Sequence, residues 1–126
     1  MIGRLHHTIF DCPDPAVLAQ FYSELLGLPV TYRSEDFVVV AANDTTSGLG
    51  FQLASGNPRS TWPDTSVPQQ IHLDVMVEDV EEARRKVLAL GAIQLSESVL
   101  ADPAGHPFCL IPRPHWAPPI PGSPDS

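Results

Sequence analysis

The sequence predicts an α+β protein built from two βαβββ modules in one domain. Two observations predict this fold. A strand pattern, a capped helix pattern and a glycine stop occur twice along the chain, in the same order. Short strand patterns separated by turn formers then follow each helix pattern. With 126 residues, of which 43% are hydrophobic, the chain has the length and composition of one globular domain.

The first predicted strand covers residues 4–12. Because side chains alternate across a strand, Phe10 and Cys12 are expected on one face of it. The same alternation predicts that the adjacent His6 and His7 point in opposite directions. These two histidines are therefore not expected to chelate one metal ion together.

The first predicted helix begins after Asp14 and ends at Gly27. Aspartate is a preferred N-cap residue, and Pro15 stands at the first helical position, where proline is favoured. Leu18 and Tyr22 recur at helical spacing and predict the buried side of this helix.

The second strand and helix follow the same plan. In the predicted strand of residues 71–77, the apolar face must cover the helix, so His72 and Asp74 are expected to face away from it. Asp79 is the predicted N-cap of the second helix, and Gly91 is its predicted stop.

The agreement between the two halves favours an internal duplication. His7 precedes Asp14 by seven residues, and His72 precedes Asp79 by seven residues. The alternative is that two unrelated strand–helix units share generic capping signals. Because histidine, cap, apolar stripe and stop all agree in spacing, we favour the duplication.

The remaining strands and the boundaries follow from turn formers and composition. After its helix, each half is expected to have three further strands. They lie at residues 28–33, 36–42 and 48–54 in the first half, and at residues 93–96, 97–101 and 106–111 in the second half. The single domain, residues 1–126, then divides into module one (1–54), a linker (55–68), module two (69–111) and a proline-rich tail (112–126).

Composition and charge exclude several classes of function. The net charge of −8 argues against a nucleic-acid partner, which would require a basic patch. No long apolar run predicts a signal peptide or a membrane span, so no membrane partner is expected. The two cysteines, Cys12 and Cys109, do not form a CxxC pair and are expected to be reduced, which predicts a cytoplasmic location.

Three segments carry a resemblance to a known superfamily. They are HHTIFDCPDPAVLAQFYSELLGLPV (6–30), QQIHLDVMVEDVEEARRKVLALGA (69–92) and LADPAGHPFCLI (100–111). In these segments the chain resembles the vicinal oxygen chelate superfamily, and most of all its bacterial glyoxalase-like members. The resemblance implies paired βαβββ modules that form a cupped mixed sheet around a cavity, often in a homodimer. We expect a homodimer here, with the tail around Trp116 packed on the body or on the partner subunit.

The resemblance also implies a set of metal-ligand positions. In metal-using members, ligands come from the first and last strands of each module, and these positions fall on His7 and His72, and on Gln52 and Cys109. The superfamily usually has a glutamate at one or both last-strand positions, and this chain has none there. We therefore expect either a weakly bound divalent metal, held by His7, Gln52 and His72, or no metal at all.

The candidate catalytic residues are His72 and Asp74. Asp74 lies two residues beyond His72 on the same strand face, so it could supply a carboxylate ligand or act as a base. The alternative is that it orients the histidine or lies at a solvated cavity mouth. The predicted ligand cavity is lined by His7, Gln52, Trp62, His72, Asp74 and Cys109.

Three functions remain open on this basis. We predict a glyoxalase-like protein that binds a small molecule, with catalysis undecided. One alternative is a metal-dependent lyase, isomerase or dioxygenase that acts on a small oxygen-rich substrate. The other is a metal-free protein that sequesters an antibiotic, as bleomycin-resistance proteins do, and the acidic balance of the chain favours a cationic or aromatic ligand in that case.

Overall fold

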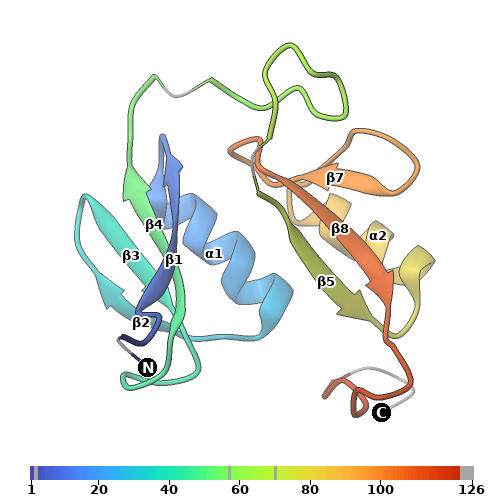
Figure 1. Ribbon diagram of the computed structural model, residues 1–126, viewed down its shortest axis with the longest axis horizontal. Coiled ribbons are helices and arrows are strands. Elements are labelled where there is room, and N and C mark those ends of the chain that lie inside the picture. The colour runs from blue at the N-terminus through green and yellow to red at the C-terminus, as the bar shows by residue number, and fades with distance from the viewer. Residues whose placement is uncertain (2, 57, 70, 123–126) are drawn as a thin grey trace. The chain divides into compact units, whose positions relative to one another are not determined.

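The computed structural model describes residues 1, 3–56, 58–69 and 71–122. The chain divides into two compact units, Met1–Pro58 and Arg59–Ser126 (Figure 1). The first unit holds β1 (His7–Cys12), α1 (Pro15–Leu26), β2 (Val30–Arg33), β3 (Phe37–Val40) and β4 (Gly48–Leu53). The second unit holds β5 (Leu73–Val77), α2 (Val80–Ala89), β6 (Ile93–Gln94), β7 (Val99–Ala101) and β8 (Pro107–Pro112).

The two units have the same topology, and the predicted pair of βαβββ modules is confirmed. The strand order is β1-β4-β3-β2 in the first sheet and β5-β8-β7-β6 in the second. In each sheet the first and last strands of the module pair in parallel, and the other neighbours are antiparallel. The arrangement of the two modules around a common cavity stays a prediction.

Both predicted helix caps are present. The Asp14 carboxylate accepts a hydrogen bond from the Val17 amide at 3.2 Å, and the Asp79 carboxylate accepts one from the Glu82 amide at 3.1 Å. Each bond satisfies one of the amides that a helix start leaves without an intrahelical partner. Gly27 follows α1 with a φ of 68°, a left-handed conformation that glycine adopts at little cost.

The core of the first module is a cluster of aromatic rings between α1 and the sheet. Tyr22 is fully buried and stacks on Phe51 with ring centroids 5.4 Å apart. Phe10 meets both rings at 5.4 and 5.6 Å. The sheet face that carries Phe10 and Phe51 therefore covers the helix, and the opposite face, here called the open face, carries His7 and the residues that alternate with the core.

In the second module the helix contributes less to the core, and its buried side chain is aliphatic. Val87 is the buried residue of α2, and it lies in the same unit as the buried Phe108 and Leu100 of the sheet. Because Phe108 faces the core, strand alternation places its neighbour Cys109 on the open face of this sheet.

The predicted DPAG turn before β8 is fixed by a buried carboxylate. Asp102 has no exposed surface, and it accepts hydrogen bonds from the amides of Ala104 and His106 at 2.9 and 3.0 Å. The His106 ring lies 2.8 Å from the same carboxylate. Gly105 completes the turn with a φ of 96°, and Arg59 packs over it so closely that a β-carbon there would lie 2.8 Å from the Arg59 Nε atom.

The tail is held to the second module by Arg113. Its guanidinium pairs with Glu78 and donates a hydrogen bond to the Ala117 carbonyl at 2.7 Å. Trp116 is 72% exposed, so its ring does not pack on the body of the protein, and the alternative of packing on a partner subunit stays a prediction. The buried Ala117 and the arginine anchor hold the tail in its place, and residues 123–126 of the predicted tail lie outside the described residues.

Two further expectations bear on where the protein could be located. Neither α1 nor α2 has the length and apolar character that crossing a bilayer requires, and this holds for the part of the chain that the structure describes. Cys12 and Cys109 are not joined in a disulfide. The cytoplasmic location stays a prediction.

Candidate ligand sites

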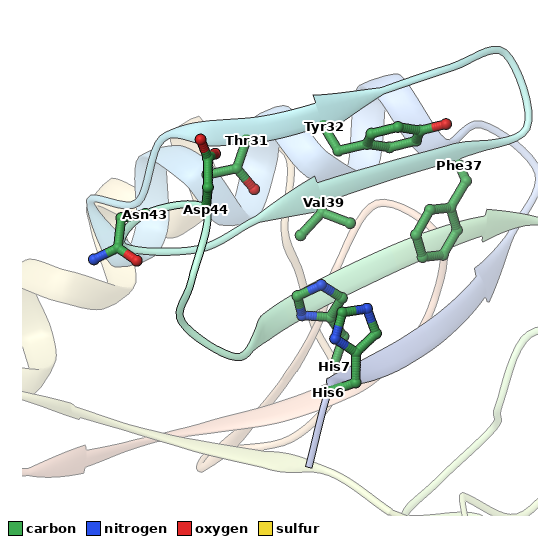
Figure 2. A pocket seen from close by; sticks show the side chains of 8 residues that line it. All are labelled: His6, His7, Thr31, Tyr32, Phe37, Val39, Asn43 and Asp44. Atoms are coloured by element: carbon green, nitrogen blue, oxygen red, sulfur yellow. The ribbon is translucent and has the colours of Figure 1, made fainter. Parts of the chain in front are cut away.

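A pocket of about 470 Å³ lies in the first module (Figure 2). It opens beside the start of β1, and Val39 of β3 lies between the histidine rings and Tyr32 in this view. Its lining residues are His6, His7, Thr31, Tyr32, Phe37, Val39, Asn43 and Asp44.

The sequence of β3 explains which of its side chains line this pocket. In β3, Val38 and Val40 face the core, so alternation places Phe37 and Val39 on the open face. Val39 pairs with Gly50 of β4, and the Phe37 and Ile9 side chains pack over this glycine. A β-carbon at Gly50 would lie only 2.7 Å from the Phe37 ring and from Ile9.

His6 and His7 stand side by side in this pocket. Their ring centroids are 4.0 Å apart and the ring planes differ by 35°, so the prediction that they point in opposite directions is wrong. The physical reason is that β1 begins at His7. His6 precedes the strand, and the alternation that governs strand residues does not apply to it.

His7 is held as a neutral ring. Its Nδ1 atom accepts a hydrogen bond from the Gly48 amide at 3.0 Å, so the ring proton must lie on Nε2. Burial lowers the pKa of His7 below its ordinary value, and a charge on the neighbouring His6 lowers it further. His7 therefore offers the Nε2–H group as a hydrogen-bond donor.

Gln52 does not lie next to His7. The strand register pairs His7 with Gly48, whereas Gln52 pairs with Asp11 and with Phe37. Gln52 is thus four residues farther along β4, which corresponds to roughly 13 Å at the usual rise of a strand. The structure does not bring these two predicted ligands together.

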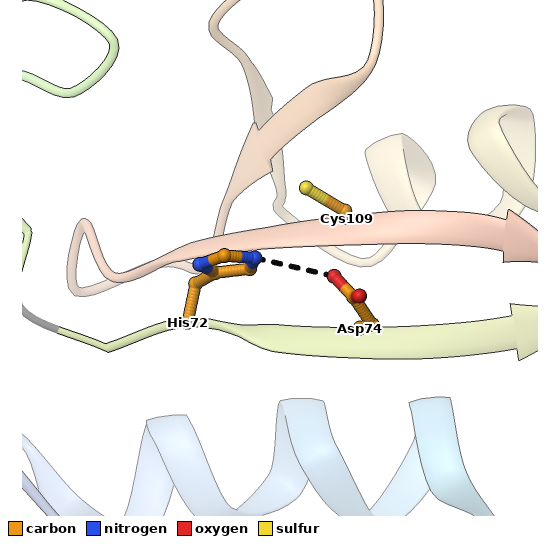
Figure 3. Close-up of side chains that lie close together, drawn as sticks. All are labelled: His72, Asp74 and Cys109. Atoms are coloured by element: carbon orange, nitrogen blue, oxygen red, sulfur yellow. Dashed lines mark ion pairs between the residues drawn. The ribbon is translucent and has the colours of Figure 1, made fainter.

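In the second module, His72, Asp74 and Cys109 lie close together on the open face (Figure 3). His72 stands directly before β5, and its Nε2 atom lies 3.2 Å from a carboxylate oxygen of Asp74. Asp74 and Cys109 are register partners on β5 and β8. One nitrogen, one oxygen and one sulfur atom of these residues all lie within 4.8 Å of one another.

Trp62, predicted to line the cavity, lies against this cluster. Its ring stacks on the His72 ring with centroids 5.5 Å apart and an angle of 16° between the planes. The stacking covers one face of the imidazole and restricts the rotation of the ring, which fixes the directions of its two nitrogen atoms. Trp62 therefore positions His72, and this contact lies wholly within the second unit.

The thiol of Cys109 is a poor nucleophile as it stands. Burial raises its pKa above the ordinary value, and the negative charge of Asp74 raises it further. A thiol with a raised pKa carries its proton at neutral pH, and a protonated thiol does not attack substrates. The arrangement therefore does not favour nucleophilic catalysis by Cys109.

The metal ion that the superfamily resemblance implies does not fit the first module. A neutral histidine that binds a metal through Nε2 must carry its proton on Nδ1, and the Gly48 amide already occupies Nδ1 of His7. His7 and Ile9 of β1 pair with Gly48 and Gly50, which have no donor side chain. Whether His7 and His72 serve one common cavity stays a prediction.

Several pocket residues were not anticipated from the sequence. They are His6, Thr31, Tyr32, Phe37, Val39, Asn43 and Asp44. The alternation within FVVV could have identified Phe37 and Val39, because its apolar run must bury every second side chain. Asp44 lies in a loop, where strand periodicity gives no signal.

Comparisons with known proteins agree on the fold. The sequence profile of the glyoxalase-like domain family matches residues 7–111. No curated protein matches the chain.

Among solved structures, a glyoxalase/bleomycin resistance protein/dioxygenase family enzyme from Burkholderia phytofirmans is similar at 17% identity and a TM-score of 0.67, over 86% of this chain and 97% of that one. A glyoxalase-related enzyme from Fulvimarina pelagi is similar at 17% identity and a TM-score of 0.61, over 86% and 87%. The trypanothione-dependent glyoxalase I of Leishmania major is similar at 19% identity and a TM-score of 0.60, over 87% and 86%. At such identities these likenesses concern the fold alone.

Proposed function

The chain belongs to the glyoxalase-like domain family of the vicinal oxygen chelate superfamily, and we propose that it binds a small aromatic cation in the pocket of its first module. The observation that carries this proposal is the lining of that pocket. Tyr32 and Phe37 offer ring faces, with centroids 6.3 Å apart, and Asp44 offers a negative charge at the rim. Aromatic faces combined with a carboxylate attract cations that carry apolar surface.

The histidines support the same ligand class. His7 is neutral for the reasons given above, so it does not repel a cation, and its Nε2–H group can donate to an acceptor on the ligand. The net charge of −8 favours the approach of positively charged molecules over anions. A metal-free mode of binding is consistent with the lack of donor side chains at Gly48 and Gly50.

A fluorescence titration with the aromatic dye ethidium, which is a planar cation, tests this proposal. Asp44→Asn should weaken binding about tenfold, equivalent to ~1.4 kcal/mol, because the attracting charge is removed. Tyr32→Ala should weaken binding by a similar factor. Glu35→Gln is the matched control, because Glu35 is an exposed carboxylate outside the pocket and its loss should change the affinity less than twofold. Equal effects of Asp44→Asn and Glu35→Gln would show only general charge attraction and would refute the proposal.

A metal-dependent lyase, isomerase or dioxygenase is the second candidate. The observation in its favour is the group of three donor atoms from His72, Asp74 and Cys109. Under this hypothesis, turnover of the hemithioacetal of a 2-oxoaldehyde or of a catechol should depend on an added divalent ion and should be lost in His72→Gln. Turnover that persists in a chelator would remove this candidate.

We also propose that the protein forms a homodimer. The support is the Trp116 ring, a large apolar side chain that is 72% exposed and that a partner subunit could cover. Light scattering at micromolar concentration should give the mass of two chains, and Trp116→Ser should shift the equilibrium toward one chain. A monomer in both cases would contradict the proposal.

A further inference from the structure

We propose that Trp116 of a second copy of this chain inserts into the pocket of the first module, so that tail and pocket together form the contact between two subunits. This inference rests on the aromatic-cation pocket proposed above, and it deepens that proposal by naming a ligand that the protein itself supplies. It also gives the homodimer a defined contact, in which each subunit contributes a residue to the binding site of its partner.

The tail presents the Trp116 ring on a turn that hydrogen bonds hold in place. The Ala117 amide donates to the Pro114 carbonyl at 3.0 Å, and the Arg113 guanidinium donates to the Ala117 carbonyl at 2.7 Å. The Arg113 amide donates in turn to the Val77 carbonyl at 2.8 Å, which joins the turn to the end of β5. Ala117 is buried, whereas Trp116 beside it is 72% exposed. The ring is therefore held in solvent by an ordered backbone.

An exposed tryptophan held in this way has the properties of a binding anchor. A tryptophan that becomes buried removes roughly 150–250 Å² from water, and tryptophan is enriched among the residues that dominate interface energies. Because the turn is already ordered, docking its ring costs less conformational entropy than docking a flexible segment. The prolines on both sides of the ring restrict the backbone further; they are Pro114, Pro118 and Pro119.

The pocket of the first module offers a complementary surface for an indole ring. The ring centroids of Tyr32 and Phe37 are 6.3 Å apart, and Val39 lies between Tyr32 and the histidine rings (Figure 2). Tyr32 is 55% exposed, so its ring is free to pack against a group from another molecule. The pocket volume of about 470 Å³ is in the range of sites that enclose small molecules, so one indole side chain fits into it.

The charge of the tail favours it as the segment that enters an acidic protein. The chain has a net charge of −8, but residues 112–122 contain no acidic residue. The charge of Arg113 is balanced by its ion pair with Glu78, so His115 is the basic group next to the Trp116 ring that remains to meet a carboxylate. The tip of the tail therefore combines an aromatic ring with a basic group, which is the ligand chemistry proposed for the pocket.

The rim of the pocket supplies the carboxylate. Asp44 lines the pocket, and the Asn43 side chain orders its loop by accepting hydrogen bonds from the Thr45 amide and hydroxyl at 2.9 and 2.8 Å. The neutral His7 ring does not repel a basic group. We therefore place the partner's Trp116 between the aromatic walls and the partner's His115 against Asp44. A symmetric pair of chains makes this contact twice, because each chain has one tail and one pocket.

Dilution of the full-length Trp62→Phe variant tests the proposal. Trp116 is then the remaining tryptophan, and the phenylalanine keeps a ring against His72. At micromolar concentration we expect a dimer with blue-shifted Trp116 emission, and dilution should shift the emission to the red as sedimentation shows single chains. Tyr32→Ala should weaken the dimer about tenfold or more, because it removes a wall of the pocket. Ile93→Ser is the matched control, because Ile93 is 50% exposed but lies outside the pocket and the tail, and it should change the dimer affinity less than about twofold.

A mixture of two variants shows whether the contact joins two chains. Trp116→Ser keeps an intact pocket, and Tyr32→Ala keeps an intact tail. A dimer of either variant alone therefore lacks both contacts, whereas the mixed dimer keeps one. With a heavy nitrogen isotope in one variant, native mass spectrometry should detect more mixed dimers than random pairing gives. Random pairing would contradict the proposal.

Ethidium binding separates this inference from the proposed ligand class. Where the wild type is a dimer, the partner's Trp116 competes with the dye, so Trp116→Ser should bind ethidium about tenfold more tightly than the wild type. If neither protein binds ethidium but Tyr32→Ala still weakens the dimer, the ligand class fails and the inference stands. If both bind it equally and Tyr32→Ala leaves the dimer unchanged, the inference fails and the ligand class stands.

Three results of the dilution experiment would overturn the proposal. Blue-shifted Trp116 emission from single chains would show that the ring docks within its own chain. Red-shifted emission at every concentration would leave the ring for a different partner, such as another protein or a membrane surface. A dimer that Tyr32→Ala does not weaken would have its contact elsewhere on the molecule.

Discussion

The two modules share their strand order and their helix caps but differ in the open faces of their sheets. In the first module, Ile9 of β1 lies opposite Gly50 of β4, the Phe37 ring packs over this glycine, and Phe37 and Tyr32 line the pocket. In the second module, the register partners at the corresponding positions are Asp74 and Cys109. One fold thus presents a hollow with aromatic walls in one copy and a cluster of metal-binding side chain types in the other.

This difference shows which residues the fold constrains. A helix needs a cap and a stop, and a core needs apolar residues at alternate strand positions, so these features recur in both modules. The open face of each sheet has no such requirement, because its side chains do not hold the helix against the sheet. Residues there are therefore able to diverge toward different chemistry while the topology stays the same.

Truncation of the two helix cores should show the largest contrast. Tyr22→Ala removes a ring that is fully buried among other rings, and it should lower the free energy of unfolding by about 3–5 kcal/mol. Val87→Ala removes two carbon atoms from α2 and should cost roughly 2 kcal/mol. Urea unfolding followed by circular dichroism measures both. A larger loss for Val87→Ala would contradict the view that the first module has the more extensive helix core.

Substitution of a glycine in β4 should cause the next largest loss of stability. A β-carbon at Gly48 would lie 2.1 Å from the Val40 carbonyl oxygen, so the backbone must shift in Gly48→Ala. We expect a loss of about 1–3 kcal/mol in unfolding free energy, as for other overpacked sites. Gly3→Ala is the control, because a β-carbon there meets no atom within 4 Å and should be neutral. A neutral Gly48→Ala would contradict the close approach of Val40 and Ala41 to this glycine.

The two caps should have equal and smaller effects. Asp14→Ala and Asp79→Ala each remove one carboxylate-to-amide hydrogen bond and a favourable charge at a helix start, which should cost about 1 kcal/mol each. Denaturant midpoints of the two variants can be compared directly. If one substitution were silent and the other severe, the equivalence of the two modules at their helix starts would be lost.

The pH dependence of stability should show the smallest effect, and it should involve the first module. The pKa of His7 is lowered in the folded state by burial and by His6, so above the ordinary histidine pKa the ring is neutral in both the folded and the unfolded states. As the pH falls below that value, the unfolded chain takes up the proton first, and folded stability declines. Wild type should therefore lose more stability than His7→Gln between about pH 6.5 and pH 5, measured by thermal unfolding. Parallel curves for the two proteins would show that the His7 ring does not titrate differently on folding.

Local signals in the sequence predicted much of the fold. Asp14, Asp79 and the following glycines are short-range features, and they gave the helices and the paired βαβββ order correctly. Register is different, because it depends on which distant strands meet. The superfamily resemblance placed Gln52 in one ligand set with His7, whereas the pairing of β1 with β4 puts glycine beside His7. The proximity of Asp74 to Cys109 likewise depends on a parallel pairing of two strands that are far apart in the chain.

Prediction from the sequence was also limited at the ends of strands. His6 lies one residue before β1, and there the alternation that holds inside a strand failed to predict its direction. Asp44 and the stacking of Trp62 on His72 involve loop and linker residues, whose positions follow from turns and not from periodicity. Each candidate site therefore combines strand residues with residues that lie outside regular structure, and the latter were the harder ones to predict.

The parallel pairing of first and last strands has a consequence for synthesis on the ribosome. β1 is made early, but its partner β4 ends only at Leu53, so the first strand must remain without its sheet neighbour until the rest of that module has emerged. The antiparallel strands between them have nearer partners and can pair sooner. The same delay is repeated for β5, which waits for β8. Each module should therefore become protected from proteases in one late step, when its final strand closes the sheet.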